Sequence, residues 1–509
     1  MMISRYIKYT VFVFLISALS VFSQSLSKDK IANLAKENLE TSVNNLKELL
    51  SIPNVAFVKK DIGKNINYII SKFKPLEFNY KILPTVGNPQ LFIEKIIDNK
   101  LPTVLFYMQL DGQPVDSSKW AQPDPFTPVL KKPVGNSKWN IIDWNNLNKS
   151  YDPEWRVFAR TAADAKGPIA MFLSALEILQ KENITSPFNI KGIFDTEEEL
   201  GSPHLLDAIK KNKELLKADY LVVLDGPRHI SNLPTLVYGA RGIITMQLKV
   251  FGPRVPQHSG HYGNYAPNPA FRLAQLLSSM KDENGRVLLP GYYNDVKFND
   301  ETKKNMNNVP DDENEIKKRL GIAEAEKVGN NYQESIQYPS LNIDGLQSAW
   351  VGDQTRTVVP ASATASMDIR LVPENDPQWL INLVRHHIAE QGYHFVNNEP
   401  TENERMKYDK LISFNYQYLY PAFRTDFGTP IDHWLTRVMK NIFGNTLIKI
   451  RQTGGSVPIS FFIKELNVPA VLLAMVNMDD NQHSPNENLR LGNYFEGIQT
   501  CLSLLTTKI

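Results

Sequence analysis

Several acidic and polar side chains fall where apolar stretches of the sequence end. The stretch TVLFYM leads to Gln109 and Asp111, FNIKGIFD leads to Glu198 and Glu199, and DYLVVL leads to Asp225. Gln109 and Asp111 are two residues apart, which places their side chains on one face of a strand. Carboxylates in such positions are suited to binding a divalent metal ion and to transferring a proton.

Two further residues extend this set of oxygen donors and add an imidazole. Asp164, in RTAADAKG, precedes the apolar helical pattern GPIAMFLSALEIL, and His483 follows the apolar stretch VPAVLLAMVN. Donors of these types, without a thiolate, are typical of zinc, manganese or cobalt hydrolases. Each residue alone has a structural explanation, as a turn residue, a charge at a helix end or an exposed histidine. Their joint occurrence favours a metal site.

The elements that must position these residues follow an α/β order. Apolar strand patterns alternate with amphipathic helical patterns, including a helix over 167–182 with Pro168 in its first turn. This order predicts a mostly parallel sheet with helices on both faces. Ligands of such sheets bind beyond the carboxyl ends of the strands, so the segments above are expected to meet in one crevice.

A second, α+β domain is expected to be inserted into the first. The pattern changes to half-exposed antiparallel strands near Val237, and the α/β pattern returns after Lys410. Within the insertion, the charged segment 300–327 is expected to form an exposed helical extension. The predicted division is a signal peptide over 1–23, a catalytic domain in two parts over 24–236 and 411–509, and a lid or dimerisation domain over 237–410.

Composition and charge exclude some partners. The 509 residues are 42% hydrophobic and 22% charged, with a formal net charge of +2. Nucleic-acid binding usually requires a strong basic excess, so no nucleic-acid partner is expected. The single cysteine, Cys501, excludes an internal disulfide framework and is expected in the core.

The N-terminal residues have the pattern of a secretory signal. Arg5 and Lys8 precede an apolar run over 10–22, and cleavage is expected after Ser23. A membrane-spanning helix would need about 20 apolar residues. We therefore expect an exported protein, periplasmic or extracellular, without membrane association after cleavage.

The motifs resemble those of the co-catalytic dinuclear metallopeptidases, the family of carnosinase, aminoacylase, carboxypeptidase G, acetylornithine deacetylase and succinyl-diaminopimelate desuccinylase. Within this family, the sequence most resembles the carnosinase-like dipeptidases. The resemblance implies a zinc-exopeptidase-like α/β fold, an inserted lid, a homodimer formed through that lid, and a small peptide or N-acyl amino acid as substrate. The motifs that carry it span nearly all of the mature chain: WAQPDPFTPVL, DAKGPIA, HSGHYGNYAPNP, LLPGYYNDV, DIRLVP, TGGSVP and HSPNENLRL.

Matched residue by residue, the resemblance implies a metal site. Asp164 corresponds to a carboxylate that bridges two metals, and Glu199 and His483 correspond to the other ligands of one metal. Asp225 corresponds to a ligand of the other metal, and Asp111 to a carboxylate that orients a ligand. The implied cofactor is a divalent metal, zinc above all, with manganese or cobalt as alternatives and one or two ions per chain.

The resemblance also implies residues that act on the substrate. Glu198 corresponds to the general base that activates water, and His258 to a lid histidine that reaches a partner subunit's active site. Arg370 corresponds to an arginine that binds the substrate carboxylate. Two plain alternatives stay open, that His258 only packs beside His261 and that Arg370 is a surface strand residue. A backbone loop near the carboxylate is matched by Gly454, Gly455 and Ser456.

Gln109 departs from the family pattern, which has His-x-Asp where this chain has QLD. Glutamine is a poor zinc ligand, and no histidine precedes Asp164. Three interpretations stay open. Gln109 ligates the metal and donates its NH2 to Asp111, or the second metal is absent or exchangeable, or the protein is a catalytically silent peptide or amino-acid binder. The presence of Glu198, His258 and Arg370 favours a hydrolase of an amide or peptide bond next to a free carboxylate, as in a dipeptidase, carboxypeptidase or N-acyl amino acid deacylase.

Overall fold

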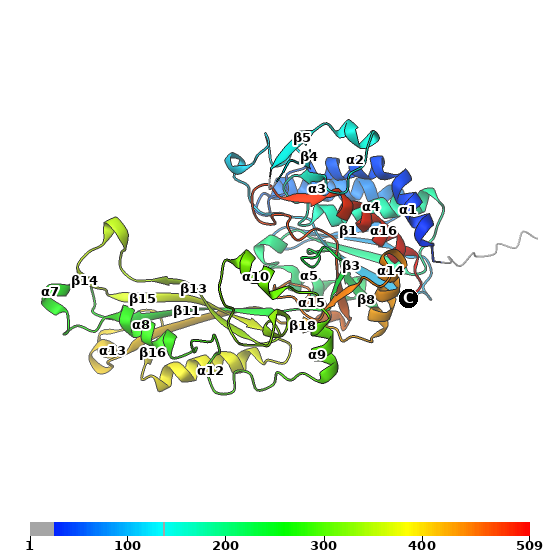
Figure 1. Cartoon of the computed structure of the whole chain (residues 1–509). Helices are drawn as coiled ribbons and strands as arrows, with labels where there is room; N and C mark the ends of the chain where they lie inside the picture. The colour runs from blue at the N-terminus through cyan, green and yellow to red at the C-terminus, as the bar shows by residue number, and fades with distance from the viewer. Residues whose placement is uncertain (1–24, 136–137) are drawn as a thin grey trace, which may run out of the picture.

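The structure is a computed structural model that describes residues 25–135 and 138–509. The predicted signal peptide over 1–23 lies outside the described residues. Figure 1 shows two lobes, a larger one that contains both ends of the described chain and a longer, thinner one built around a second sheet. Among the helices of the described ranges, none is both long enough and apolar enough to cross a membrane.

An eight-stranded sheet forms the centre of the larger lobe. Its neighbouring strands pair in parallel at four contacts, β3 with β7, β3 with β8, β8 with β20, and β9 with β19. This confirms the predicted mostly parallel sheet. Its strands, in spatial order, are β1 (Asn79–Leu83), β2 (Gln90–Lys95), β7 (Asn189–Asp195), β3 (Thr103–Gln109), β8 (Tyr220–Val223), β20 (Ala470–Ala474), β9 (Thr235–Val237) and β19 (Ile448–Ile450).

Helices cover both faces of this sheet, as predicted. Successive side chains of a strand point to opposite faces, and β3 shows the result: Phe106 and Met108 enter one core while Leu105 and Tyr107 enter another. Cys501 lies in the first core and is fully buried, as expected. The first core contains α1 (Lys28–Glu37), α2 (Leu39–Leu50), α3 (Lys59–Phe73), α4 (Lys166–Lys181), α14 (Pro430–Phe443) and α16 (Leu491–Thr506), and the second contains α5 (Leu205–Lys211) and α15 (Ser460–Leu466).

The thinner lobe is a five-stranded sheet with helices packed against its core. The helices are α8 (Pro269–Ser278) and α12 (Pro377–Glu390). The chain enters and leaves this lobe through β10 (Gly239–Ala240) and β18 (Phe423–Arg424), which pair with each other. The strands, in spatial order, are β13 (Ser340–Gln347), β15 (Ser362–Leu371), β11 (Gly242–Phe251), β17 (Leu411–Tyr420) and β16 (His394–Val396).

The predicted charged extension is helical, with α9 (Asp300–Asn307) and α10 (Glu313–Leu320), followed by α11 (Tyr332–Ser335). Figure 1 shows α9 and α10 beside the larger lobe rather than at the free end of the thinner one. A buried hydrogen bond joins them to it, because His229 Nε2 lies 2.9 Å from Asp311 Oδ1. The segment therefore connects the two lobes.

Candidate active site

The predicted residues gather at the carboxyl edge of the larger sheet. Gln109 is the last residue of β3. The neighbouring parallel strand β7 leads into a short 3-10 helix over Glu198–Leu200, and β8 leads to Asp225. Since parallel neighbours end at the same edge of a sheet, these residues are brought together as expected.

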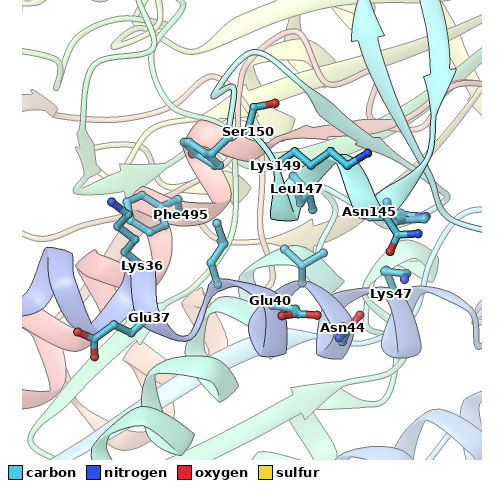
Figure 2. A pocket seen from close by; sticks show the side chains of 14 residues that line it. Lys36, Glu37, Glu40, Asn44, Lys47, Asn145, Leu147, Lys149, Ser150 and Phe495 are labelled. Carbon is cyan, nitrogen blue, oxygen red and sulfur yellow. The ribbon is translucent and has the colours of Figure 1, made fainter.

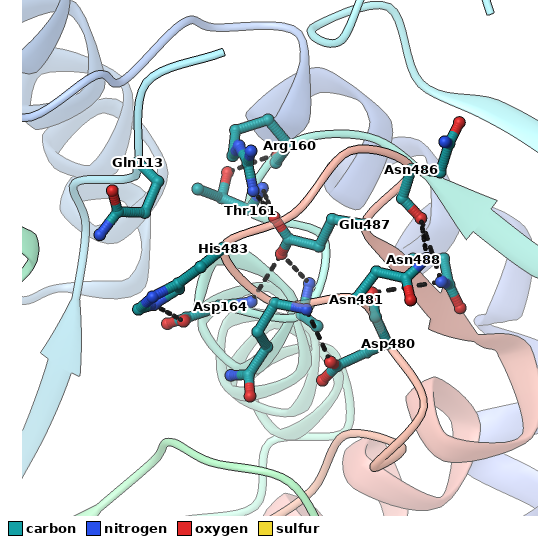
Figure 3. A network of polar contacts seen from close by, with 12 residues as sticks. Gln113, Arg160, Thr161, Asp164, Asp480, Asn481, His483, Asn486, Glu487 and Asn488 are labelled. Atoms are coloured by element: carbon teal, nitrogen blue, oxygen red, sulfur yellow. Dashed lines mark hydrogen bonds and ion pairs between the residues drawn. The ribbon is translucent and has the colours of Figure 1, made fainter. Parts of the chain in front are cut away.

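Asp164, Glu199 and His483 form a compact group of donors. One donor atom from each lies within 4.8 Å of the other two. His483 Nε2 is 3.1 Å from Asp164 Oδ2 and 3.3 Å from Glu199 Oε2, and Figure 3 shows the imidazole directed at Asp164. Two carboxylates and an imidazole are suitable ligands for a divalent ion such as zinc. These three residues therefore fit the metal that the sequence predicts.

A buried carboxylate that the sequence analysis missed holds this site in shape. Glu487 is 1% exposed and accepts hydrogen bonds from the backbone N–H groups of Thr161, Ala163 and Asp164. Its carboxylate also pairs with Arg160 Nη1 at 2.9 Å, as Figure 3 shows. Glu487 thus fixes the turn that carries Asp164. Sequence patterns did not reveal this role, because three of the hydrogen bonds of Glu487 come from backbone N–H groups, which every residue except proline has.

The site concentrates negative charge away from water. Burial, followed by repulsion from Asp164, raises the pKa of Glu199 to about 7 and the pKa of Asp225 to about 8. Burial also raises the pKa of Glu198 well above its usual value, with Asp225 the next largest cause. The hydrogen bond to Asp164 raises the pKa of His483 to about 9. A bound cation would relieve this repulsion.

Asp111 holds the turn that carries the two glutamates. Its Oδ1 accepts a hydrogen bond from Glu198 N at 3.1 Å, and its Oδ2 accepts one from Glu199 N at 3.0 Å. One of the three open interpretations gave Asp111 a hydrogen bond from the Gln109 amide, and this bond is absent among the described residues. Gln109 Nε2 is buried and has no hydrogen-bond partner among the residues that the structure describes.

The residues expected to bind the substrate carboxylate also meet. Arg370, on β15, donates from Nη1 to Ser456 Oγ at 3.0 Å and from Nε to Asp368 Oδ2 at 2.9 Å. The arginine is therefore fixed in place rather than free at the surface. A second guanidinium, Arg241, was not foreseen. Its backbone N–H donates to Gly455 O, and burial followed by repulsion from Arg370 lowers its pKa to about 10.

His258 is exposed and packs beside His261, with 4.7 Å between the ring centroids. It ends β12 (Gln257–His258) and precedes α7 (Ser259–Tyr262), which lies at the free end of the thinner lobe in Figure 1. Within one chain it does not join the other site residues.

A separate cavity of about 670 Å³ contains none of the predicted site residues. It lies between the N-terminal helices and residues 144–151, and Figure 2 shows charged and amide side chains around it. No cluster of metal ligands accompanies it in the described ranges.

Comparison with known proteins gives consistent matches. The sequence matches peptidase family M20/M25/M40 over residues 105–507. The Cys-Gly metallodipeptidase dug1 of Schizosaccharomyces pombe is 26% identical over 497 residues, 93% of this chain and 97% of the relative. The Beta-Ala-His dipeptidase of Mus musculus is 27% identical over 420 residues, 80% of this chain and 77% of the relative. The M20 family metallo-carboxypeptidase Sso-CP2 of Sulfolobus solfataricus has a TM-score of 0.74 at 27% identity, covering 92% of this chain and 98% of that one.

The same comparisons overturn the prediction of an exported, periplasmic or extracellular protein. The relatives that align over most of the chain include the yeast Cys-Gly metallodipeptidases, whose names describe no exported enzyme. The prediction rested on Arg5, Lys8, the apolar run over 10–22 and the small residues before Gln24, and such a pattern reports charge and hydrophobicity rather than destination.

The matches support metal-dependent dipeptide hydrolysis, and with it the predicted hydrolase rather than a silent binder. They agree with the predicted resemblance, with the observed fold and with the donor group at the carboxyl edge of the sheet. The matched region covers most of the sequence, from β3 to α16. The chain therefore belongs to peptidase family M20/M25/M40.

Proposed function

We propose that the chain cleaves the peptide bond of a dipeptide next to its free carboxylate, with a divalent ion held by Asp164, Glu199 and His483. The observation that carries this proposal is the approach of these three side chains to within 4.8 Å of one another. A divalent ion in such a site lowers the pKa of water and polarises a carbonyl.

Glu198 is the proposed general base. It is not one of the three clustered donors, yet it precedes Glu199 on the same turn and is held there by Asp111. Its pKa is raised by burial and by Asp225, and a carboxylate of raised pKa is a better proton acceptor. Glu198 takes the proton of the attacking water and passes it to the leaving nitrogen.

Arg370 and the loop of Gly454, Gly455 and Ser456 are proposed to bind the free carboxylate of the substrate. A guanidinium can bind a carboxylate through two parallel hydrogen bonds. The bond between Arg370 and Ser456 supports this role. Arg241 is close to Arg370 and to the loop residue Gly455, and it adds positive charge to this part of the site.

We propose zinc as the ion, with one tightly bound ion per chain. Gln109 and Asp225 remain for a second position. A neutral amide is a weak ligand for zinc, and the Gln109 nitrogen is buried without a partner in the described part of the chain. These residues do not fit a second tightly held cation, and we place no step of the reaction there.

A homodimer formed through the thinner lobe is proposed, with the partner subunit's His258 stabilising the oxyanion of the transition state. The support is that His258 is exposed far from its own site and that β13 is an edge strand with Ile343 and Leu346 exposed. We propose an inserted domain that begins at β11, because Val237 belongs to β9 of the larger sheet, and ends after Tyr420, because β17 pairs with β11.

Replacement of Glu198 by Gln tests the proposed reaction. We expect dipeptide hydrolysis to fall by about 10²–10⁴-fold, while metal content stays the same because Glu198 is not a ligand. The matched control is Glu283→Gln, a change to an exposed carboxylate of the thinner lobe. A wild-type protein that binds zinc and dipeptides but hydrolyses none would refute the proposal and restore the silent binder.

A further inference from the structure

A mostly apolar cavity of about 250 Å³ opens between two parts of the proposed active site. Its lining includes Asp225 of the proposed metal site, and Gly454 and Gly455 of the loop proposed to bind the substrate carboxylate. Because residues from both parts line it, the cavity adjoins the region where a dipeptide would bind.

The larger sheet forms one wall of this cavity. Val237 on β9, Ile450 on β19, and Leu472 and Ala474 on β20 supply apolar side chains from adjacent strands. Such a wall cannot hydrogen-bond a polar group, so the cavity favours an apolar occupant.

The helical extension of the thinner lobe forms another wall of the cavity. Ile316, on α10, and Ile336, just after α11, line it. This wall is fixed to the larger lobe, because Gln452 Nε2 donates to Ile336 O at 3.0 Å. The exposed segment that the sequence left without a role therefore shapes the active site.

Apart from Asp225 of the proposed metal site, the charged side chains that line the cavity have polar partners or are exposed to solvent. His229 Nε2 lies 2.9 Å from Asp311 Oδ1, and Arg228 Nη1 lies 2.5 Å from Glu496 Oε2. Arg319, at the end of α10, is exposed. Arg228, His229 and Asp311 therefore already have polar partners before any ligand enters.

We infer that this cavity is a specificity pocket that receives one large apolar side chain of the peptide substrate, with Ile316 as a wall residue that sets its size. The inference rests on the proposed function. It assigns a substrate class, peptides with an aliphatic or aromatic residue, and it gives α10 a direct role in selection.

The test compares kcat/KM for glycylleucine and leucylglycine with that for glycylglycine. The wild type is expected to prefer one of the two leucyl peptides by at least about tenfold, since a single methylene in an apolar pocket discriminates by that much. Ile316→Trp, which fills the pocket, should reduce this ratio to about twofold or less. A ratio of two substrates does not depend on the fraction of folded enzyme.

The control is Asn314→Trp, which places the same side chain on an exposed position of α10 that does not line the cavity. Its preference should equal that of the wild type. Hydrolysis without a leucyl preference, or a preference unchanged by Ile316→Trp, would overturn the inference alone. Preference for a glutamyl over a leucyl peptide would also overturn it and identify Arg319 as the recognising group. Failure to hydrolyse any peptide would refute the proposed function itself.

Discussion

Gln109 decides how many ions the site can hold tightly. It ends β3 beside the carboxylates, but it contributes a neutral amide instead of an imidazole. Replacement by His should raise the zinc content from one ion per chain to two, measured by elemental mass spectrometry after gel filtration. Gln109→Asn is the control, because it keeps the amide. Two ions in the wild type would show that the glutamine already completes a second site.

Protonation of the site should control both metal binding and stability. The pKa values of Glu199, Asp225 and His483 are all raised, to about 7, about 8 and about 9. A group whose pKa is higher in the folded than in the unfolded state stabilises the folded state. This stabilisation is complete at pH values below the unfolded pKa and is lost as pH rises through the folded pKa. The melting temperature of chelator-treated protein should therefore fall between about pH 4.5 and pH 9.

Metal binding displaces these protons, so the ion is expected to bind more tightly as pH rises over the same range. The stabilisation by zinc, measured as the difference in melting temperature with and without the ion, should grow with pH. Glu199→Gln should flatten both trends. A zinc-dependent difference that shrinks as pH rises would contradict this account.

At the scale of elements, the turn before α4 depends on Glu487. Removing one partner of a buried ion pair leaves the other charge unpaired, so Glu487→Ala should destabilise the fold by about 3–5 kcal/mol in denaturant unfolding. It should also weaken zinc binding, because Asp164 N is one of its donors. The control is Asp479→Ala, since the Asp479 side chain is 64% exposed in its pair with Arg156 and exposed pairs contribute about 0–1 kcal/mol. Equal losses in the two variants would contradict the anchoring role.

Elements governed by local patterns were predictable. The helix expected over 167–182 is α4, Lys166–Lys181, because its apolar residues and Pro168 determine it locally. The meeting of Glu199, Asp225 and Gln109 followed from the rule that parallel strands end at one edge. Glu487, in contrast, acts through backbone donors of a distant turn, and neither its partners nor its burial can be read from neighbouring residues.

The packing of the helical extension against the larger lobe could not be predicted from the sequence either. Its charges indicate an exposed helix, and α10 is indeed mostly exposed. The pairing of His229 with Asp311 joins residues far apart in the chain, and such long-range pairs leave no periodic signal. Sequence reasoning therefore found the helices and missed the pocket that they close.

At the scale of the whole molecule, the proposed dimer predicts that two inactive variants restore activity when their subunits are mixed. Glu198→Gln and His258→Ala should each reduce hydrolysis. When the two variants are mixed and allowed to exchange subunits, each mixed dimer has one site with an intact Glu198 and the partner subunit's His258. Random exchange should restore about a quarter of the wild-type activity. Mixtures that stay as inactive as their parts, although dimers form, would show that His258 acts in no partner's site.

The central claim is that Asp164, Glu199 and His483 hold a divalent ion that the reaction requires. The most direct measurement is metal content per chain, by elemental mass spectrometry, on protein supplied with zinc, manganese or cobalt and then desalted. The account predicts one ion in the wild type and none in Asp164→Ala, with peptide hydrolysis following the ion. A wild-type chain that retains none of the three metals, or an Asp164→Ala variant that retains as much as the wild type, would contradict it.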